Sequence, residues 1–277
     1  MSLNVYNLTQ PQEAIWNTER FYPNTSINTI SGRVIINSKF NRKLLEKAIN
    51  LFVQTTKGIR YQFDINNDIV TQYEKKYEPF SVDFIKLCST NEKDILNSIS
   101  RKVFSLYNSP LYYFAIFETE SKQGGFFVCV HHIISDAWSM SLLVNSIMSI
   151  YSKLLKNEEL TFSDIYNYSD FIEQEKTYLS SSRFNKDKSF WNELFNENIF
   201  DNSFSGNVNT MSAFSTNASR AEFKLSSTFT KKIVDFCKEI KVSPFTFILF
   251  IMEIYEGKIN QTDKVVLSTP ILYRSSA

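Results

Sequence analysis

The chain has 277 residues, of which 43% are hydrophobic and 15% aromatic, enough apolar material for one large domain or two smaller lobes. Its formal net charge of +1 argues against binding to nucleic acids or membrane surfaces through bulk electrostatics. The longest apolar run, residues 245–255, is too short to cross a bilayer, and the N-terminus lacks the features of a signal peptide. The cysteines have no CxxC spacing, so we expect reduced thiols and a soluble protein of the cytoplasm.

The first part of the chain alternates between predicted strands and predicted helices. The β-branched residues at 27–36 predict a strand. At 40–54, apolar residues recur at helical spacing after Asn41, which is a favourable N-cap residue, so this segment predicts an amphipathic helix. Two further strands and a further helix are predicted at residues 58–63, 79–87 and 91–106.

A β-hairpin is predicted at residues 110–132, followed directly by a long helix. Two apolar strands flank a polar turn that ends in Gly124-Gly125. Ser135 and Asp136 open the helix, because short polar side chains favour its N-terminus. The predicted core face of this helix comprises Leu142, Leu143, Ile147, Ile150 and Leu154.

The second half of the chain is mainly helical up to residue 195, and the Asn- and Ser-rich residues 200–218 predict a connecting loop. A second block follows, with Pro244 in the first turn of its last helix. Its predicted elements are a strand, two helices and a strand, at residues 221–225, 228–240, 244–256 and 264–271. Strands, helices and hairpins in this mixture favour an α+β fold, a mixed α/β sandwich.

Both histidines of the chain are adjacent, at the end of the second hairpin strand. Strand alternation directs His132 to the face of Val128 and Val130, and His131 to the opposite face. Asp136 falls at the N-cap of the next helix, where its carboxylate could accept backbone N–H bonds or pair with an arginine. Because an imidazole can take up a proton near neutral pH, His132 is a candidate general base.

Three other interpretations of this segment stay open from the residues alone. Two histidines can fill a half-buried strand end without doing any chemistry. A metal site of His132 and Asp136 would lack the third and fourth ligands that zinc needs, so we expect no metal. A cysteine or serine nucleophile paired with histidine is weakly supported, because Cys129 shares the face of His131 and no G-x-S-x-G motif exists.

The segment "HHIISDAWS", residues 131–139, resembles the HHxxxDG signature of condensation domains of nonribosomal peptide synthetases. This family belongs to the chloramphenicol-acetyltransferase-like superfamily. Four further segments are similar to family motifs in the same order, at residues 8–16, 55–63, 168–175 and 242–274. "FWNELF" resembles the helix that follows the Y-x-D-F/Y-A motif. The resemblance implies a chloramphenicol-acetyltransferase-like lobe at residues 1–175, and a linker with the first part of a similar lobe at 176–277.

The chain departs from the family pattern in several places. Ala137 replaces the glycine that ends HHxxxDG, and Thr55-Thr56-Lys57 stands where the family has R-H-E, so only Arg60 remains of that motif's arginines. Ser268 replaces the glycine of G-T-P. The resemblance also leads us to expect a C-terminally incomplete domain.

The resemblance implies a peptide-bond-forming reaction in a channel between two lobes. Acyl or peptidyl and aminoacyl groups would arrive on phosphopantetheine arms of donor and acceptor peptidyl carrier proteins of adjacent synthetase modules, with no cofactor bound directly. His132 would position the amine and accept its proton. His131 and Asp136 would hold the turn, with Arg274 the first and Arg60 the second candidate for pairing with Asp136. Backbone N–H groups near Ala137 and Trp138 would stabilise the oxyanion.

Two functional alternatives remain at this point. A related acyltransferase would act on a free acceptor and need no second carrier protein. A truncated, inactive docking or scaffolding remnant would retain the fold without the activity. An epimerisation domain fits the residues after Asp136 poorly, and a heterocyclisation domain would have aspartates in place of the histidines.

Overall fold

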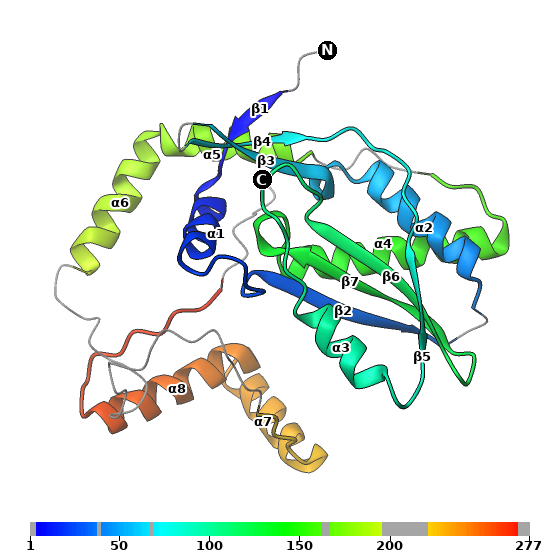
Figure 1. Cartoon of the computed structure of the whole chain (residues 1–277). Coiled ribbons are helices and arrows are strands. Elements are labelled where there is room, and N and C mark those ends of the chain that lie inside the picture. Colours follow the sequence, from blue (N-terminus) through cyan, green and yellow to red (C-terminus); the bar gives the residue numbers. More distant parts are fainter. Residues whose placement is uncertain (1–3, 38–39, 67–68, 162–166, 196–220, 271–277) are drawn as a thin grey trace. The chain divides into compact units, whose positions relative to one another are not determined.

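The computed structural model describes residues 4–37, 40–66, 69–161, 167–195 and 221–270. The chain forms two compact units, Met1–Lys176 and Thr177–Ala277. Figure 1 shows a mixture of helices and strands in the first unit and helices in the second. The expected α+β class is confirmed.

A four-stranded sheet with the order β2-β7-β6-β5 forms the centre of the first unit. Its central strand β7 pairs antiparallel with both β2 and β6, and β5 pairs parallel with β6. Every residue of β7 is buried, which explains its continuous apolar sequence, because both faces of the strand are covered. The strands span Thr29–Ile36 (β2), Asp83–Leu87 (β5), Tyr112–Thr119 (β6) and Gly124–His131 (β7).

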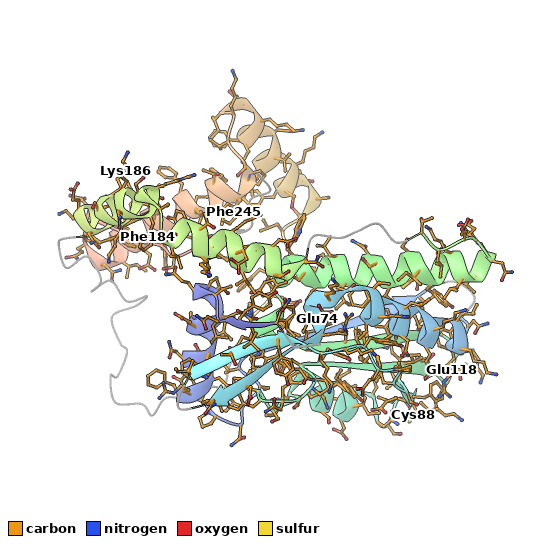
Figure 2. All side chains as sticks on the ribbon, turned by 90° about the horizontal axis from the view of Figure 1, so that it is seen from above. Glu74, Cys88, Glu118, Phe184, Lys186 and Phe245 are labelled. Atoms are coloured by element: carbon orange, nitrogen blue, oxygen red, sulfur yellow. The ribbon has the colours of Figure 1, made fainter. Side chains whose placement is uncertain are left out.

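Helices cover the two faces of this sheet. The helices α2 (Arg42–Thr55) and α4 (Ala137–Lys156) lie side by side over one face, as Figures 1 and 2 show. The helix α3 (Glu92–Ser100) packs on the other face. Alternate β7 residues therefore enter different cores: Val128 packs with residues of α2 and α4, and Cys129 packs with Ile99 of α3.

A second sheet of three strands has the order β1-β4-β3. Its strands are Val5–Asn7 (β1), Tyr61–Asn66 (β3) and Ile69–Glu74 (β4). The sequence patterns did not predict β1 or β4. The strand predicted at 58–63 starts only at Tyr61, because Lys57–Arg60 form the 3-10 turn η1. The helix α1 (Gln10–Phe21) follows β1.

The N-cap predicted for α2 is confirmed, because the side chain of Asn41 accepts a hydrogen bond from the N–H of Leu44. The helix predicted at 91–106 was too long, since α3 ends at Ser100. Beyond it, Phe104 and Leu106 are buried and the residue between them is exposed. This alternation is typical of an extended segment.

The predicted hairpin 110–132 is confirmed, but the role of its two glycines was wrong. Gly124 and Gly125 are the first residues of β7, and the turn before them contains Lys122 with a positive φ of 65°. A Cβ at Gly125 would lie 2.0 Å from the carbonyl oxygen of Val34, so close strand packing explains the glycine there. In α4, the predicted core residue Leu142 is 53% exposed, whereas Tyr151 is buried.

The second unit begins within the last turn of the helix α5 (Tyr168–Leu179). Its helices are Ser182–Leu194 (α6), Ser227–Glu239 (α7) and Pro244–Asn260 (α8), and Pro244 opens α8 as predicted. The described residues of 221–225 and 264–270 form no strand, contrary to prediction. A strand needs a hydrogen-bonded neighbour, and the described part of this unit contains none. The loop predicted at 200–218 lies outside the described residues.

Candidate active site

The two histidines lie where the central strand of the sheet ends. His131 is the last residue of β7, and His132 begins the short 3-10 turn η2 (His132–Ile134). Ser135 and Asp136 then connect this turn to α4. The apolar run of β7 stops at this point because the chain leaves the covered interior of the sheet.

His131 is an internal residue, with only 2% of its surface exposed. Its Nδ1 accepts a hydrogen bond of 3.1 Å from the backbone N–H of Ile133, and its Nε2 lies 3.4 Å from Oε2 of Glu19. The ring also meets the ring of Phe104 edge-on, with 6.2 Å between centroids. Burial lowers the pKa of His131, and the nearby Glu19 carboxylate opposes this shift only in part, so the ring is neutral at neutral pH.

His132 is exposed, although its backbone is held firmly. Its N–H donates a hydrogen bond of 2.7 Å to the carbonyl oxygen of Asn28, and its own carbonyl oxygen accepts one from the N–H of Ser135. The prediction that the strand continues through His132 was wrong, because η2 begins there. Its imidazole is therefore open to contact from outside, unlike Val128 and Val130, which are buried.

The N-cap position predicted for Asp136 is confirmed. Its Oδ1 accepts a hydrogen bond of 2.7 Å from the N–H of Ser139 in the first turn of α4. A carboxylate at this position also interacts favourably with the positive end of the helix dipole. Of the two arginines expected to pair with it, Arg274 lies outside the described residues.

Arg60, the second candidate, is not a partner of Asp136. Its guanidinium donates to the carbonyl oxygens of Val53 and Gln54 at 2.6 and 2.7 Å, and forms an ion pair with Glu74. The last carbonyls of a helix lack partners within the helix, and a cation suits the negative end of the helix dipole. Arg60 therefore caps the C-terminus of α2, and the expectation that it braces Asp136 was wrong.

Ala137 and Trp138 form the start of α4, as expected. Both side chains are exposed. Within the described part of the chain, the backbone N–H groups of these two residues have no acceptor, as is usual in the first turn of a helix. They are available to an oxyanion.

The environment of Cys129 does not favour a nucleophilic thiolate. Its Sγ is buried and donates a hydrogen bond of 3.2 Å to the carbonyl oxygen of Ile99, and burial raises the pKa of the thiol to about 11. Such a thiol stays protonated at neutral pH. Among the residues that the structure describes, no three His, Cys, Asp or Glu side chains group as metal ligands would, and no helix is long and apolar enough to cross a membrane.

Glu19 and Asn28 are two site residues that the sequence patterns did not indicate. The Nδ2 of Asn28 donates a hydrogen bond of 2.8 Å to the same Glu19 oxygen that faces His131. Glu19 and His131 are 112 positions apart in the chain. No periodicity or motif spacing could have connected them.

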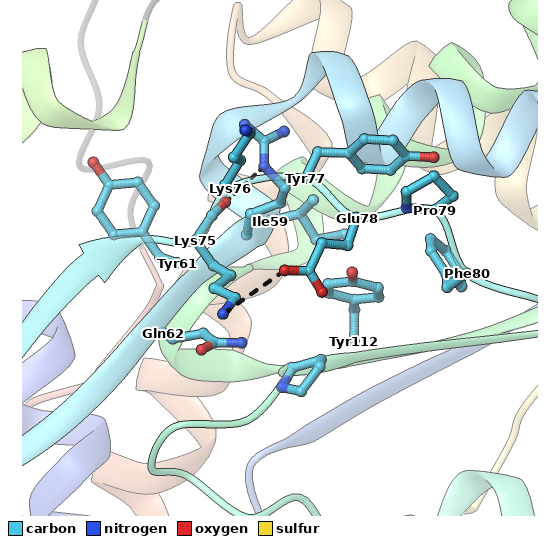
Figure 3. Close-up of a pocket in the computed structure, with 12 residues that line it drawn as sticks. Ile59, Tyr61, Gln62, Lys75, Lys76, Tyr77, Glu78, Pro79, Phe80 and Tyr112 are labelled. Carbon is cyan, nitrogen blue, oxygen red and sulfur yellow. Dashed lines mark hydrogen bonds and ion pairs between the residues drawn. The ribbon is translucent and has the colours of Figure 1, made fainter. Parts of the chain in front are cut away.

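A separate cavity of about 200 Å³ lies beside Arg60, between β3, the segment after β4 and the start of β6 (Figure 3). Tyr61, Tyr77 and Tyr112 are among its lining residues, and Lys75 and Glu78 form an ion pair of 4.0 Å beside it. None of the residues of the HHxxxD turn lines this cavity. It is therefore distinct from the histidine site.

The sequence and the fold of this chain are similar to those of known proteins. The family model described as "Condensation domain" matches residues 2–277. Surfactin synthase subunit 1 of Bacillus subtilis (strain 168) is 30% identical over 100% of this chain, and a plipastatin synthase of the same organism is 29% identical over 97%. The chain spans only 8% and 11% of the lengths of these two relatives.

Two solved structures have the same fold. The first condensation domain of the CDA synthetase matches 94% of this chain and 64% of its own, with a TM-score of 0.77 and 16% identity. The starter condensation domain of the rhizomide synthetase RzmA matches 69% of this chain and 48% of its own, with a TM-score of 0.60 and 19% identity. Because the family model spans nearly all residues, this chain belongs to the condensation domain family that these peptide synthases contain.

Proposed function

We propose that this chain forms an amide bond between an acyl or peptidyl thioester and the amine of an aminoacyl acceptor. The donor is carried on the phosphopantetheine arm of one carrier protein and the acceptor on that of a second. The observation that carries the proposal is the pair of environments at the strand end, with His131 buried and His132 exposed. Membership of the condensation domain family supports the same reaction.

His132 positions the attacking amine and accepts its proton. The amine nitrogen bonds to the thioester carbonyl carbon, the carbon–sulfur bond breaks, and the proton lost by the amine passes through the imidazole to the leaving thiolate. Imidazole is the side chain best suited to both taking up and releasing a proton in one reaction at neutral pH. Alignment of the two reactants contributes a further part of the rate.

The start of α4 stabilises the negative charge that develops on the carbonyl oxygen. The N–H groups of Ala137 and Trp138 supply the hydrogen bonds, and the positive end of the helix dipole adds to them. No cofactor of the chain's own takes part, because the phosphopantetheine arms of the carrier proteins deliver both substrates. The neighbouring modules of a synthetase are the expected partners.

The test is amide formation between two loaded carrier proteins, measured for the wild type and for His132→Ala. We expect the rate to fall by about a hundredfold to ten-thousandfold, which is typical of losing a general base. The melting temperature should stay unchanged, because the side chain is exposed. Asn145→Ala is the control, since Asn145 is an exposed residue of α4 and should retain full activity.

Unchanged product formation by His132→Ala would remove the catalytic role of His132. Omitting the acceptor carrier and adding a free amine tests the alternative acyltransferase. Equal rates with the free amine would replace the second carrier protein with a free acceptor. A wild type that forms no amide with either acceptor would support the docking or scaffolding role.

A further inference from the structure

The carboxylate of Glu19 in α1 is contacted by Asn28, which directly precedes β2, and by His131 at the end of β7. Its Oε2 accepts from Nδ2 of Asn28 at 2.8 Å and faces Nε2 of His131 at 3.4 Å. Only 13% of the Glu19 side chain and 3% of the His131 side chain are exposed. A largely buried carboxylate is costly unless hydrogen bonds compensate it, so this arrangement needs both donors.

The contacts determine which nitrogen of His131 carries the proton. Nδ1 accepts a hydrogen bond from the N–H of Ile133, so it has no proton of its own. The neutral ring therefore holds its proton on Nε2 and directs it toward Glu19. The ring thereby links α1 to the backbone of η2.

A second link reaches His132 itself. The carbonyl oxygen of Asn28 accepts the backbone N–H of His132 at 2.7 Å, while the side chain of the same Asn28 donates to Glu19. In addition, Gln12 of α1 donates to the carbonyl oxygen of Ile133 at 3.2 Å. The backbone on both sides of His132 is thus held by residues that contact α1.

We propose that Glu19 is a positioning residue of the His132 site, acting through Asn28 on one side and through His131 on the other. Glu19 does not touch the reacting groups. It fixes the backbone from which the exposed imidazole of His132 projects. This inference rests on the proposed function, because only the amide-forming reaction uses the position of His132.

Histidine NMR tests the inference without any substrate. The chain has only two histidines, so a long-range proton–nitrogen spectrum contains two imidazole signal sets, which His132→Ala assigns. We expect His131 to be the Nε2-protonated neutral tautomer at neutral pH. A proton on Nδ1 of His131 in the wild type would overturn the inference.

Glu19→Ala removes the acceptor of both donors. We expect the imidazole signals of His132 to shift and its backbone amide to exchange at least about tenfold faster, because local opening becomes easier. In the amide-forming assay, kcat should fall by about 10- to 100-fold with KM nearly unchanged, as for a misplaced catalytic group. Glu19→Gln should restore most of kcat, since its amide oxygen can accept both hydrogen bonds.

Glu13→Ala is the matched control. Glu13 is an exposed residue of the same helix, and its replacement removes the same charge. It should leave kcat and the His132 signals unchanged. Asn28→Ala should reproduce part of the loss of Glu19→Ala, because it breaks one of the two contacts of Glu19. The double variant Glu19→Ala/Asn28→Ala should be no slower than Glu19→Ala alone, because Glu19→Ala already removes the acceptor of Asn28.

The inference fails if Glu19→Ala leaves kcat within about twofold of the wild type and the His132 amide equally protected. It also fails if Glu19→Ala and Glu13→Ala lose activity equally. If Glu19→Ala does not fold, kcat and the amide exchange of His132 are measured in Asn28→Ala and Glu19→Gln instead. The inference then fails if Asn28→Ala has the kcat and amide protection of the wild type. A wild type without any amide product would contradict the proposed function, whereas the tautomer and amide exchange would still decide whether Glu19 positions His132.

Discussion

His131 and His132 are consecutive residues, yet the ring of His131 lies inside the protein against Phe104, whereas the side chain of His132 is exposed. The strand ends between them, so one backbone step separates an internal support from a group that can meet substrates. The internal ring keeps its hydrogen bonds satisfied by Glu19 and Ile133. The two histidines therefore have different roles, and they should respond differently to substitution.

Stability should fall as the pH drops below the ordinary histidine pKa of about 6.5. Burial lowers the pKa of His131 in the folded chain, so the unfolded chain binds the proton more readily. Acid therefore stabilises the unfolded state relative to the folded state. The slope cannot exceed about 1.4 kcal/mol per pH unit for one group. Denaturant unfolding of the wild type from about pH 5 to 7.5 should show this decline, and a free energy of unfolding that does not fall on acidification would contradict the lowered pKa of His131.

Glu175 should partly offset that decline. Burial raises the pKa of Glu175, so its contribution to stability is present at low pH and is lost as the pH rises through the folded-state pKa. Glu175→Gln removes this opposing contribution. The decline on acidification should therefore be steeper in Glu175→Gln than in the wild type, and a shallower decline would contradict the assignment.

Replacing Asp136 should reduce stability through loss of the N-cap of α4. Asp136→Ala should lower the free energy of unfolding by about 1 kcal/mol, because the N–H of Ser139 loses its acceptor. Asp136→Asn should lose less, since asparagine is an equally good N-cap residue. Thermal unfolding measures both. An Asp136→Ala variant with wild-type stability and no activity would show that Asp136 acts in the reaction itself.

Gly125→Ala should prevent normal pairing of β7 with β2. The added Cβ would lie 2.0 Å from the carbonyl oxygen of Val34 and 2.7 Å from the ring of Phe117. We expect a loss of at least about 3 kcal/mol or no folded protein, because backbone must move. Gly58→Ala is the control, since its nearest atom would lie 3.9 Å away, which is an ordinary contact. Equal stability of the two variants, measured by thermal unfolding, would be inconsistent with this packing.

Cys129 should resist alkylation in the folded protein. Burial raises the pKa of its thiol to about 11, so little thiolate forms at neutral pH. The buried sulfur is also inaccessible to the reagent. Cys88 is partly exposed and should react first with iodoacetamide. Peptide mass spectrometry before and after denaturation measures the difference. Labelling of native Cys129 as fast as Cys88 would show that the strand end opens readily.

Local patterns were sufficient for much of the fold. The helical spacing after Asn41 predicted α2, the hairpin at 110–132 was confirmed, and the N-cap at Asp136 was found where a short polar residue precedes an apolar helix. Each of these features depends on residues close together in the chain. The family motifs likewise depend on short segments, and the family match confirmed that resemblance.

The local sequence patterns could not predict contacts between distant segments of the chain. The sequence around Arg60 does not indicate that this residue caps α2 and pairs with Glu74 instead of Asp136. Two of the strands of the second sheet were missed, because a short strand is stabilised by its neighbours more than by its own composition.

The sequence by itself determined that the two histidines lie where a buried strand leads into a capped helix, because strand patterns and capping act over a few residues. Only the tertiary structure decided which ring is enclosed, which is exposed, and that Glu19 and Asn28 hold them. The physical reason is that hydrogen bonds between α1 and the strand end form only once packing has brought these separate segments together.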